Sequence, residues 1–302
     1  MSQQPSATVV NEHATAANAR LMAAAHGGDA ELLGRLLDLG AGDPLAPNSQ
    51  GRTPLMMAAV SDRVECVSLL IPRSEMEATD NEKNTALMLA LQGNSDRCAA
   101  ELLSAGKANP NTANVRGTTP LDVACSRGNA ESIRLLLDAG VDPRAGASSD
   151  RIPPLARLAQ SLCLDGLRIF LPFCDPNLSR RDTGMTALMH VCSAHASGDS
   201  IACLDLLAPA SNLLARSAQG FTAFDLAIRC GKNDCADHLA LLMPDEAVEA
   251  SLASWGRAGI SAIPQWAARR EATQLDEAVR LAAGPRTPQD EASMARKQSA
   301  RL

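Results

Sequence analysis

Apolar residues recur in this chain in pairs of short clusters separated by polar turns, at a spacing of about 33 residues. The clearest copy runs from Gly117 to Gly140, with a Thr-Pro-Leu start, a break at Gly128 and a second, leucine-rich cluster. The leucine that opens the first cluster recurs at Leu21, Leu55, Leu87, Leu121, Leu155 and Leu188, and is replaced by phenylalanine at Phe224. A fixed period of this length predicts a solenoid built from one repeated unit.

Each unit predicts two short helices. A threonine followed by proline or alanine, as in Thr119-Pro120, suits a helix N-cap and first helical position. The second helix ends at a glycine such as Gly140, which suits the left-handed conformation that follows many helices, or at a proline such as Pro72. The fifth copy lacks the threonine and begins at Pro153. We therefore expect about seven helix pairs over residues 14–243.

The polar turn, the Thr-Pro-Leu start, the two helices and the glycine exit resemble the ankyrin repeat. This resemblance implies an all-α ankyrin-repeat solenoid of stacked helix-turn-helix units joined by β-turn fingers. The family usually carries a histidine after the leucine, where it hydrogen-bonds between neighbouring repeats. This chain instead has Met22, Met56, Met88, Asp122, Ala156, Met189 and Asp225 there. We therefore expect fewer polar ties between repeats and more apolar contact.

The two ends of the chain differ from the repeats. Residues 1–13 predict a disordered N-terminal lead, and residues 285–302 predict a disordered tail. Residues 244–284 predict a C-terminal helical cap that covers the last repeat, since terminal repeats need one. Its second helix is expected to present Trp266, Leu275, Val279 and Ala282 as its apolar side. A partner-binding helix is the alternative interpretation of this segment.

Composition excludes several classes of function. The 302 residues carry a net charge of −6 and only 2% aromatic residues, which disfavours binding to nucleic acid and to acidic membranes. No apolar run approaches the ~18 residues of a membrane-spanning helix, and the N-terminus lacks the features of a Sec-type signal peptide. We expect a monomeric cytoplasmic protein. Export as an effector is left open.

No residue pattern predicts catalysis, a metal or a cofactor. The nine cysteines are scattered and are expected to be reduced core residues. His190, Cys192 and His195 form the one cluster resembling metal ligands, but their spacing fits one helical face poorly, and a zinc site needs about four ligands. Asp122 and Asp225 are expected to be surface or capping groups. The chain is therefore not expected to be an enzyme.

The repeat pattern favours a non-catalytic protein-binding module, a scaffold or adaptor that binds a partner on its concave face. The alternatives are a secreted effector acting on a host protein and, in a different class, an enzyme or enzyme subunit with an unrecognised site. Arginines among the candidate contacts favour an acidic partner segment. The candidate contacts, at the finger turns and the exposed ends of the first helices, are Gln50, Arg52, Glu82, Asn84, Arg116, Thr118, Ser126, Arg127, Gln160, Asp182 and Arg229.

Overall fold

The structure of the chain is a computed structural model, which describes residues 7–106, 108–143, 152–195 and 199–282. It divides into two compact units, Met1–Leu226 and Ala227–Leu302. The described residues form helices, turns and loops without a β-strand, so the expected all-α class is confirmed. None of these helices combines the length and the apolar character that crossing a lipid bilayer requires.

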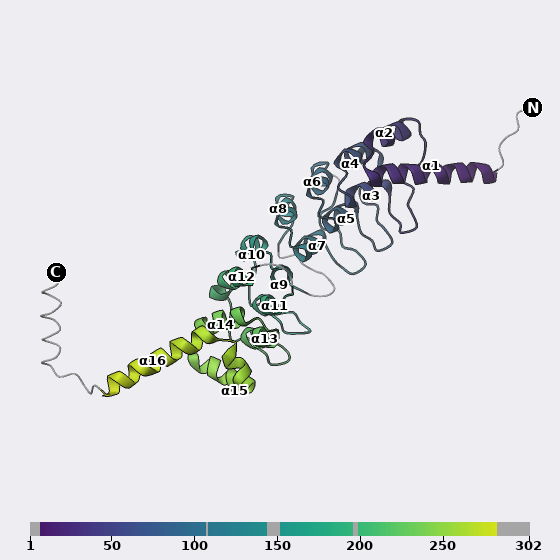
Figure 1. Cartoon of the computed structure of the whole chain (residues 1–302). Coiled ribbons are helices and arrows are strands. Elements are labelled where there is room, and N and C mark those ends of the chain that lie inside the picture. Colours follow the sequence, from purple (N-terminus) through teal and green to yellow (C-terminus); the bar gives the residue numbers. More distant parts are fainter. Residues whose placement is uncertain (1–6, 107, 144–151, 196–198, 283–302) are drawn as a thin grey trace, which may run out of the picture. The chain divides into compact units, whose positions relative to one another are not determined.

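Paired helices make up the first unit (Figure 1). The inner helices are α1 (Ala7–Gly27), α3 (Pro54–Val60), α5 (Ala86–Gln92), α7 (Pro120–Arg127), α9 (Pro154–Gln160) and α11 (Ala187–Ser193). The outer helices are α2 (Ala30–Asp38), α4 (Val64–Leu70), α6 (Asp96–Ser104), α8 (Ala130–Asp138), α10 (Leu164–Phe170) and α12 (Ser200–Leu207). Inner helices contact inner helices and outer helices contact outer helices, so the pairs stack in two layers.

Threonine caps fix where the inner helices begin. The Oγ1 of Thr53 accepts a hydrogen bond from the N–H of Met56, and Thr85, Thr119, Thr186 and Thr222 make the equivalent bond. Helix α9 begins after Pro153 without a side-chain cap. The helix starts, including the weaker start of the fifth copy, are therefore confirmed.

The leucines that define the repeat form the core between the layers. Leu21, Leu55, Leu87, Leu121, Leu155 and Leu188 are all buried, as is Phe224. The position after the leucine is buried at Met56, Met88, Ala156 and Met189. Asp122 and Asp225 are also buried there, and each caps its own helix by accepting from the preceding threonine. They are capping groups, and the expectation that they could lie on the surface is wrong.

Short 3₁₀ turns and left-handed residues end the outer helices. Prolines continue α4 and α12 into the 3₁₀ turns η1 (Ile71–Arg73) and η2 (Ala208–Ala210). Gly140, with a φ of 84°, follows α8. Between α5 and α6 the left-handed residue is Asn94, with a φ of 56°. Asparagine tolerates this conformation because its short polar side chain bonds locally.

The second unit begins within α13 (Ala223–Arg229) and contains α14 (Asn233–Leu242), α15 (Asp245–Ser261) and α16 (Pro264–Ala282). Helix α16 packs on α14 and α15, and Trp266 and Val248 are buried in this unit. Leu275 is 68% exposed, so its predicted place on a packed face is wrong. The side chains of Val279 and Ala282 lie outside the described part.

The N-terminal helix is longer than the repeat requires. Helix α1 begins at Ala7 and has 21 residues, so it extends into residues 1–13, for which the sequence predicted a disordered lead. The predicted disordered tail, residues 285–302, lies outside the described residues.

Candidate functional site

In the described parts of the chain, loops that we call fingers connect outer helices to the next inner helix, and one side chain organises each of the first three. In the first finger the Oδ1 of Asn48 accepts from the N–H groups of Gln50 and Arg52, at 2.9 and 3.0 Å. Asp80 and Asn114 make the same two bonds in the next two fingers. Such Asx turns hold the tip in one conformation.

These turn residues were missed in the sequence, although a signal was present. Asn48, Asp80 and Asn114 each stand five residues before a capping threonine. The glycine and threonine positions alone do not reveal these turn residues, because their type alternates between Asn and Asp.

Backbone hydrogen bonds join successive fingers. The N–H of Asn81 donates to the carbonyl of Gln50, and the N–H of Val115 donates to the carbonyl of Glu82, both at 3.0 Å. Ala218 donates in the same way to Thr183 at 2.8 Å. These bonds tie the first three fingers together, and join the fingers at Thr183 and Ala218 in the same way.

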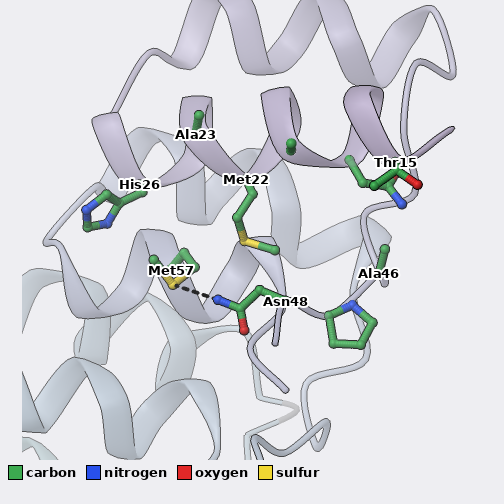
Figure 2. A pocket seen from close by; sticks show the side chains of 10 residues that line it. Thr15, Met22, Ala23, His26, Ala46, Asn48 and Met57 are labelled. Atoms are coloured by element: carbon green, nitrogen blue, oxygen red, sulfur yellow. Dashed lines mark hydrogen bonds between the residues drawn. The ribbon is translucent and has the colours of Figure 1, made fainter. Parts of the chain in front are cut away.

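A pocket of about 620 Å³ lies between α1, α3 and the first finger (Figure 2). Met22 and Met57 reach into it from the two helices, and Asn48 borders it from the finger. Its lining residues are Thr15, Asn18, Ala19, Met22, Ala23, His26, Ala46, Pro47, Asn48 and Met57. None of them carries a fixed charge at neutral pH.

We call the surface formed by the finger tips and the inner helices of the first unit the finger face. Most of the sequence-predicted contact residues lie exposed on it. Those exposed in the first unit are Gln50, Glu82, Arg116, Ser126, Arg127, Gln160 and Asp182. Arg229 is also exposed but belongs to the second unit.

Three of the candidates are less available. Asn84 is only 2% exposed, and its side chain donates to Asp80 at 3.1 Å and accepts from Asn114 at 3.0 Å. The expectation that Asn84 is an exposed contact is therefore wrong, because its amide ties two fingers together. Arg52 and Thr118 are half-buried.

The arginines on this face differ in how fully they are paired. The Nε of Arg52 lies 3.5 Å from the buried carboxylate of Asp80. Arg116 lies 3.8 Å from Glu82, with both side chains largely exposed, so this pair contributes little. Arg127 is exposed and has no hydrogen bond or ion pair to a described residue.

Arg157 and His190 are buried among the inner helices, and the sequence reasoning missed both roles. Arg157 is 8% exposed and pairs with Asp122, at 3.4 Å from Nε to Oδ1. His190 is 5% exposed, and burial, followed by the nearby charge of Arg180, lowers its pKa to about 4. Both occupy the position two residues after the repeat leucine, where Met57 and Leu89 stand in earlier repeats.

The histidine–cysteine cluster does not assemble into a metal site. His190 and Cys192 are buried, whereas His195 is exposed. Among the described residues there is no group of three or more His, Cys, Asp or Glu side chains that could hold a metal ion.

All nine cysteines are free thiols. Burial raises the pKa of the Cys98 thiol to about 12 and also raises the pKa of Cys66, Cys125 and Cys163. These thiols are therefore poor nucleophiles, because reactivity resides in the thiolate.

The repeat geometry and a family comparison agree on what these units are. Residues 9–81 and 69–147 match the family model for ankyrin repeats. The chain is an ankyrin-repeat protein. The fold is similar to the crystal structure of the human ASB11 ankyrin repeat domain, with a TM-score of 0.62 and 22% identity over 74% of this chain and 97% of that domain. Ankyrin repeats form a protein-interaction module, and typically a non-catalytic one.

Two curated relatives share the repeats. The nuclear factor NF-kappa-B p105 subunit of Mus musculus is 34% identical over 130 residues, which is 42% of this chain and 13% of that protein. The intracellular phospholipase A2 of Caenorhabditis elegans is 34% identical over 118 residues, which is 36% of this chain and 11% of that protein. The chain spans less than a third of the length of these relatives, so their activities do not carry over to it.

Proposed function

We propose that this ankyrin-repeat protein is a non-catalytic scaffold or adaptor that binds a protein partner on the finger face. The observation that carries the proposal is the exposure of polar side chains on fingers whose backbones are fixed by Asx turns and by finger-to-finger hydrogen bonds. A surface that is ordered before binding loses little conformational entropy when a partner docks.

The charges on this face favour a partner segment that carries carboxylates. Arg127 has no hydrogen bond or ion pair to a described residue, and the ion pair of Arg116 with Glu82 joins two largely exposed side chains. Both guanidinium groups can therefore bind a carboxylate without leaving a buried charge unpaired. Arg52 contributes less to this interaction, because Asp80 already neutralises it. The core requires neither Arg116 nor Arg127.

The test compares two charge-reversed variants. Arg116→Glu with Arg127→Glu changes the finger face, whereas Arg134→Glu with Arg168→Glu makes the same change in net charge on the outer helices α8 and α10. Both control arginines are exposed, and their ion pairs with described residues lie within their own helix. Proteins captured from a lysate by the wild type and by the control, but lost with the first variant, are the expected partners.

The association rate of one such partner then tests whether Arg116 and Arg127 attract an acidic segment. Association with the wild type should slow as salt rises, because exposed charges are screened within about 8–10 Å at 0.1–0.15 M. The finger-face variant should associate about tenfold more slowly at low salt. Equal capture by both variants, or an association rate indifferent to salt and to both arginines, would overturn the acidic-partner proposal.

A further inference from the structure

We infer that an extended, neutral segment of a partner protein lies along the first finger and places an apolar side chain in the pocket between Met22 and Met57. The inference rests on the proposed function and specifies the partner's chemistry at one end of the finger face. It comes from a comparison of the first finger with the fingers that follow it.

The first finger has an open edge. In the second and third fingers, the residue after the turn-forming Asx donates its N–H to the preceding finger, from Asn81 to Gln50 and from Val115 to Glu82. Ser49 is the equivalent residue of the first finger, and the described residues ahead of that finger form the helices α1 and α2 and no other finger. The N–H of Ser49 makes no hydrogen bond to a described residue. An exposed donor of this kind suits the carbonyl of an extended segment added at the edge.

The side-chain amide of Asn48 is a second hydrogen-bond donor that lacks a strong acceptor. In the third finger, the equivalent Asn114 donates from Nδ2 to Asn84 of the finger before it, at 3.0 Å. Among the described residues, the Nδ2 of Asn48 has only the thioether sulfur of Met57 as an acceptor, at 3.9 Å (Figure 2). Sulfur is a weak acceptor, so a peptide carbonyl would be a better partner. The orientation of the amide is fixed, because Oδ1 already accepts from Gln50 and Arg52.

The pocket beside these donors is apolar at its centre. Met22 and Met57 are half-buried, and Ala19 and Ala23 are exposed on α1 beside them. Methionine adapts its shape to the side chain that it contacts. The volume of about 620 Å³ falls within the roughly 300–1,000 Å³ of ligand pockets.

The lining favours an uncharged occupant. None of the lining residues carries a fixed charge, and the Nδ1 of His26 is already bonded to Ser61 Oγ at 2.7 Å. A carboxylate or an ammonium group would therefore lose water without gaining an ionic partner. A leucine-like side chain flanked by peptide carbonyls satisfies both the methionines and the two donors.

Three capped peptides test the inference. The probes are N-acetyl-Gly-Leu-Gly-N-methylamide and its Asp and Lys counterparts, titrated into full-length protein labelled with ¹³C at the methionine methyl groups and with ¹⁵N. The Leu probe should shift the methyl signals of Met22 and Met57 and the amide signals of Ser49 and of the Asn48 side chain. Met88 and Met189 are buried and serve as internal references.

A substitution found in the next finger isolates the donor. Asn48→Asp keeps the oxygen that the turn needs, as Asp80 does naturally, but removes the N–H that would meet the ligand. It should weaken binding of the Leu probe about fivefold or more, whereas Asn111→Asp, in an exposed loop, should not. If Asn48→Asp does not fold, the comparison of the three probes on the wild type still tests whether the pocket binds an apolar side chain.

The inference is overturned if the Leu probe leaves Met22 and Met57 unshifted at its solubility limit, or if the Asp or Lys probe shifts them at lower concentration. Its failure is distinguishable from failure of the proposed function. If the methyl signals of Met22 and Met57 do not shift but partner capture still depends on Arg116 and Arg127, only the pocket inference is rejected. If the methyl signals of Met22 and Met57 shift but partner capture does not depend on Arg116 and Arg127, only the acidic-partner proposal is rejected.

Discussion

The Nε of Arg157 lies 3.4 Å from the Oδ1 of Asp122, and both side chains are buried between two inner helices. Arg157 also donates from Nη1 to the Oγ of Ser126, at 3.1 Å. The second carboxylate oxygen of Asp122 caps α7 by accepting from Thr119. This ion pair therefore joins the fourth and fifth repeats at positions that are apolar in the second and third repeats.

Earlier repeats provide the matched replacement for this pair. Met56 and Leu89 occupy the positions equivalent to Asp122 and Arg157 one repeat apart. Arg157→Leu alone leaves a buried carboxylate uncompensated and should lower the free energy of unfolding by about 3–5 kcal/mol. Asp122→Met with Arg157→Leu reproduces the apolar pattern and should recover most of that loss. Urea unfolding of the wild type, both single variants and the double variant measures the coupling.

A coupling free energy near zero, with the double variant as unstable as the sum of the two single variants, would contradict this account. It would mean that the apolar pair of the second and third repeats does not fit the backbone of the fourth and fifth. The loss in both single variants would then reflect packing and not the charge pair.

His190 predicts a loss of stability in weak acid. Burial, reinforced by the charge of Arg180, lowers the pKa of its imidazole from 6.5 to about 4, whereas Asp182 acts in the opposite direction. The unfolded chain therefore binds a proton at a higher pH than the folded protein does. The stabilising contribution of the neutral ring is complete above about pH 6.5 and is lost as the pH falls towards 4, by about 3 kcal/mol at most.

Melting temperatures at about pH 7 and about pH 5 measure this effect. His190→Leu, which places the residue type of Leu89 at the equivalent position, should reduce the drop between the two pH values. His195→Leu is the matched control, because His195 is exposed and its removal should leave the drop unchanged. An equal drop in both variants would assign the acid sensitivity to other groups.

The cysteines should resist alkylation in the folded protein. Burial raises the pKa of Cys98 to about 12 and raises that of Cys66 and Cys125, so almost no thiolate exists at neutral pH. Iodoacetamide followed by peptide mass spectrometry should label these three only after unfolding, and Cys174, which is half-buried, earlier. Early labelling of Cys98 in folded protein would show that the layer of outer helices opens locally.

The sequence predicted the repeat geometry well because each repeat uses local signals. Threonine caps, the leucine column and the glycine and proline stops act within one helix or one turn, so their positions in the chain decide the structure. Leu275 is a position where local helical spacing gave a wrong prediction. Helical spacing placed it on the apolar side of α16, but its side chain is exposed, whereas Trp266 at the start of the same helix is buried.

Side chains that act between repeats were harder to predict. Asn84 stands at a finger tip in sequence, yet its amide is used by Asp80 and Asn114 on either side of it. The pairing of Arg157 with Asp122 joins residues of two successive repeats that lie far apart along the chain. Such roles depend on which residues face one another across a repeat boundary, and no local pattern specifies them.

The last prediction concerns how α16 is held in the second unit. The carboxylate of Asp237, on α14, accepts from the backbone N–H groups of Gln265 and Trp266 at 3.0–3.2 Å, so it caps α16 from a different helix. Asp237 is 5% exposed and Trp266 is buried beside it. Asp237→Ala removes the acceptor from two amides at the start of the helix. It should cost about 1–2 kcal/mol of stability.

Trp266 reports the outcome directly when Trp255→Phe leaves it as the only tryptophan. Asp237→Ala should shift the emission of Trp266 to longer wavelength and lower the temperature at which it changes, because the ring meets water once α16 detaches. Asp234→Ala alters an exposed carboxylate on the same helix and should leave the emission unchanged. If Asp237→Ala behaves like that control, the indole bond from Trp266 to Asp245, at 3.0 Å, is sufficient to anchor the helix. Trp266 would then dock α16 without its cap, and the account given for Asp237 would be wrong.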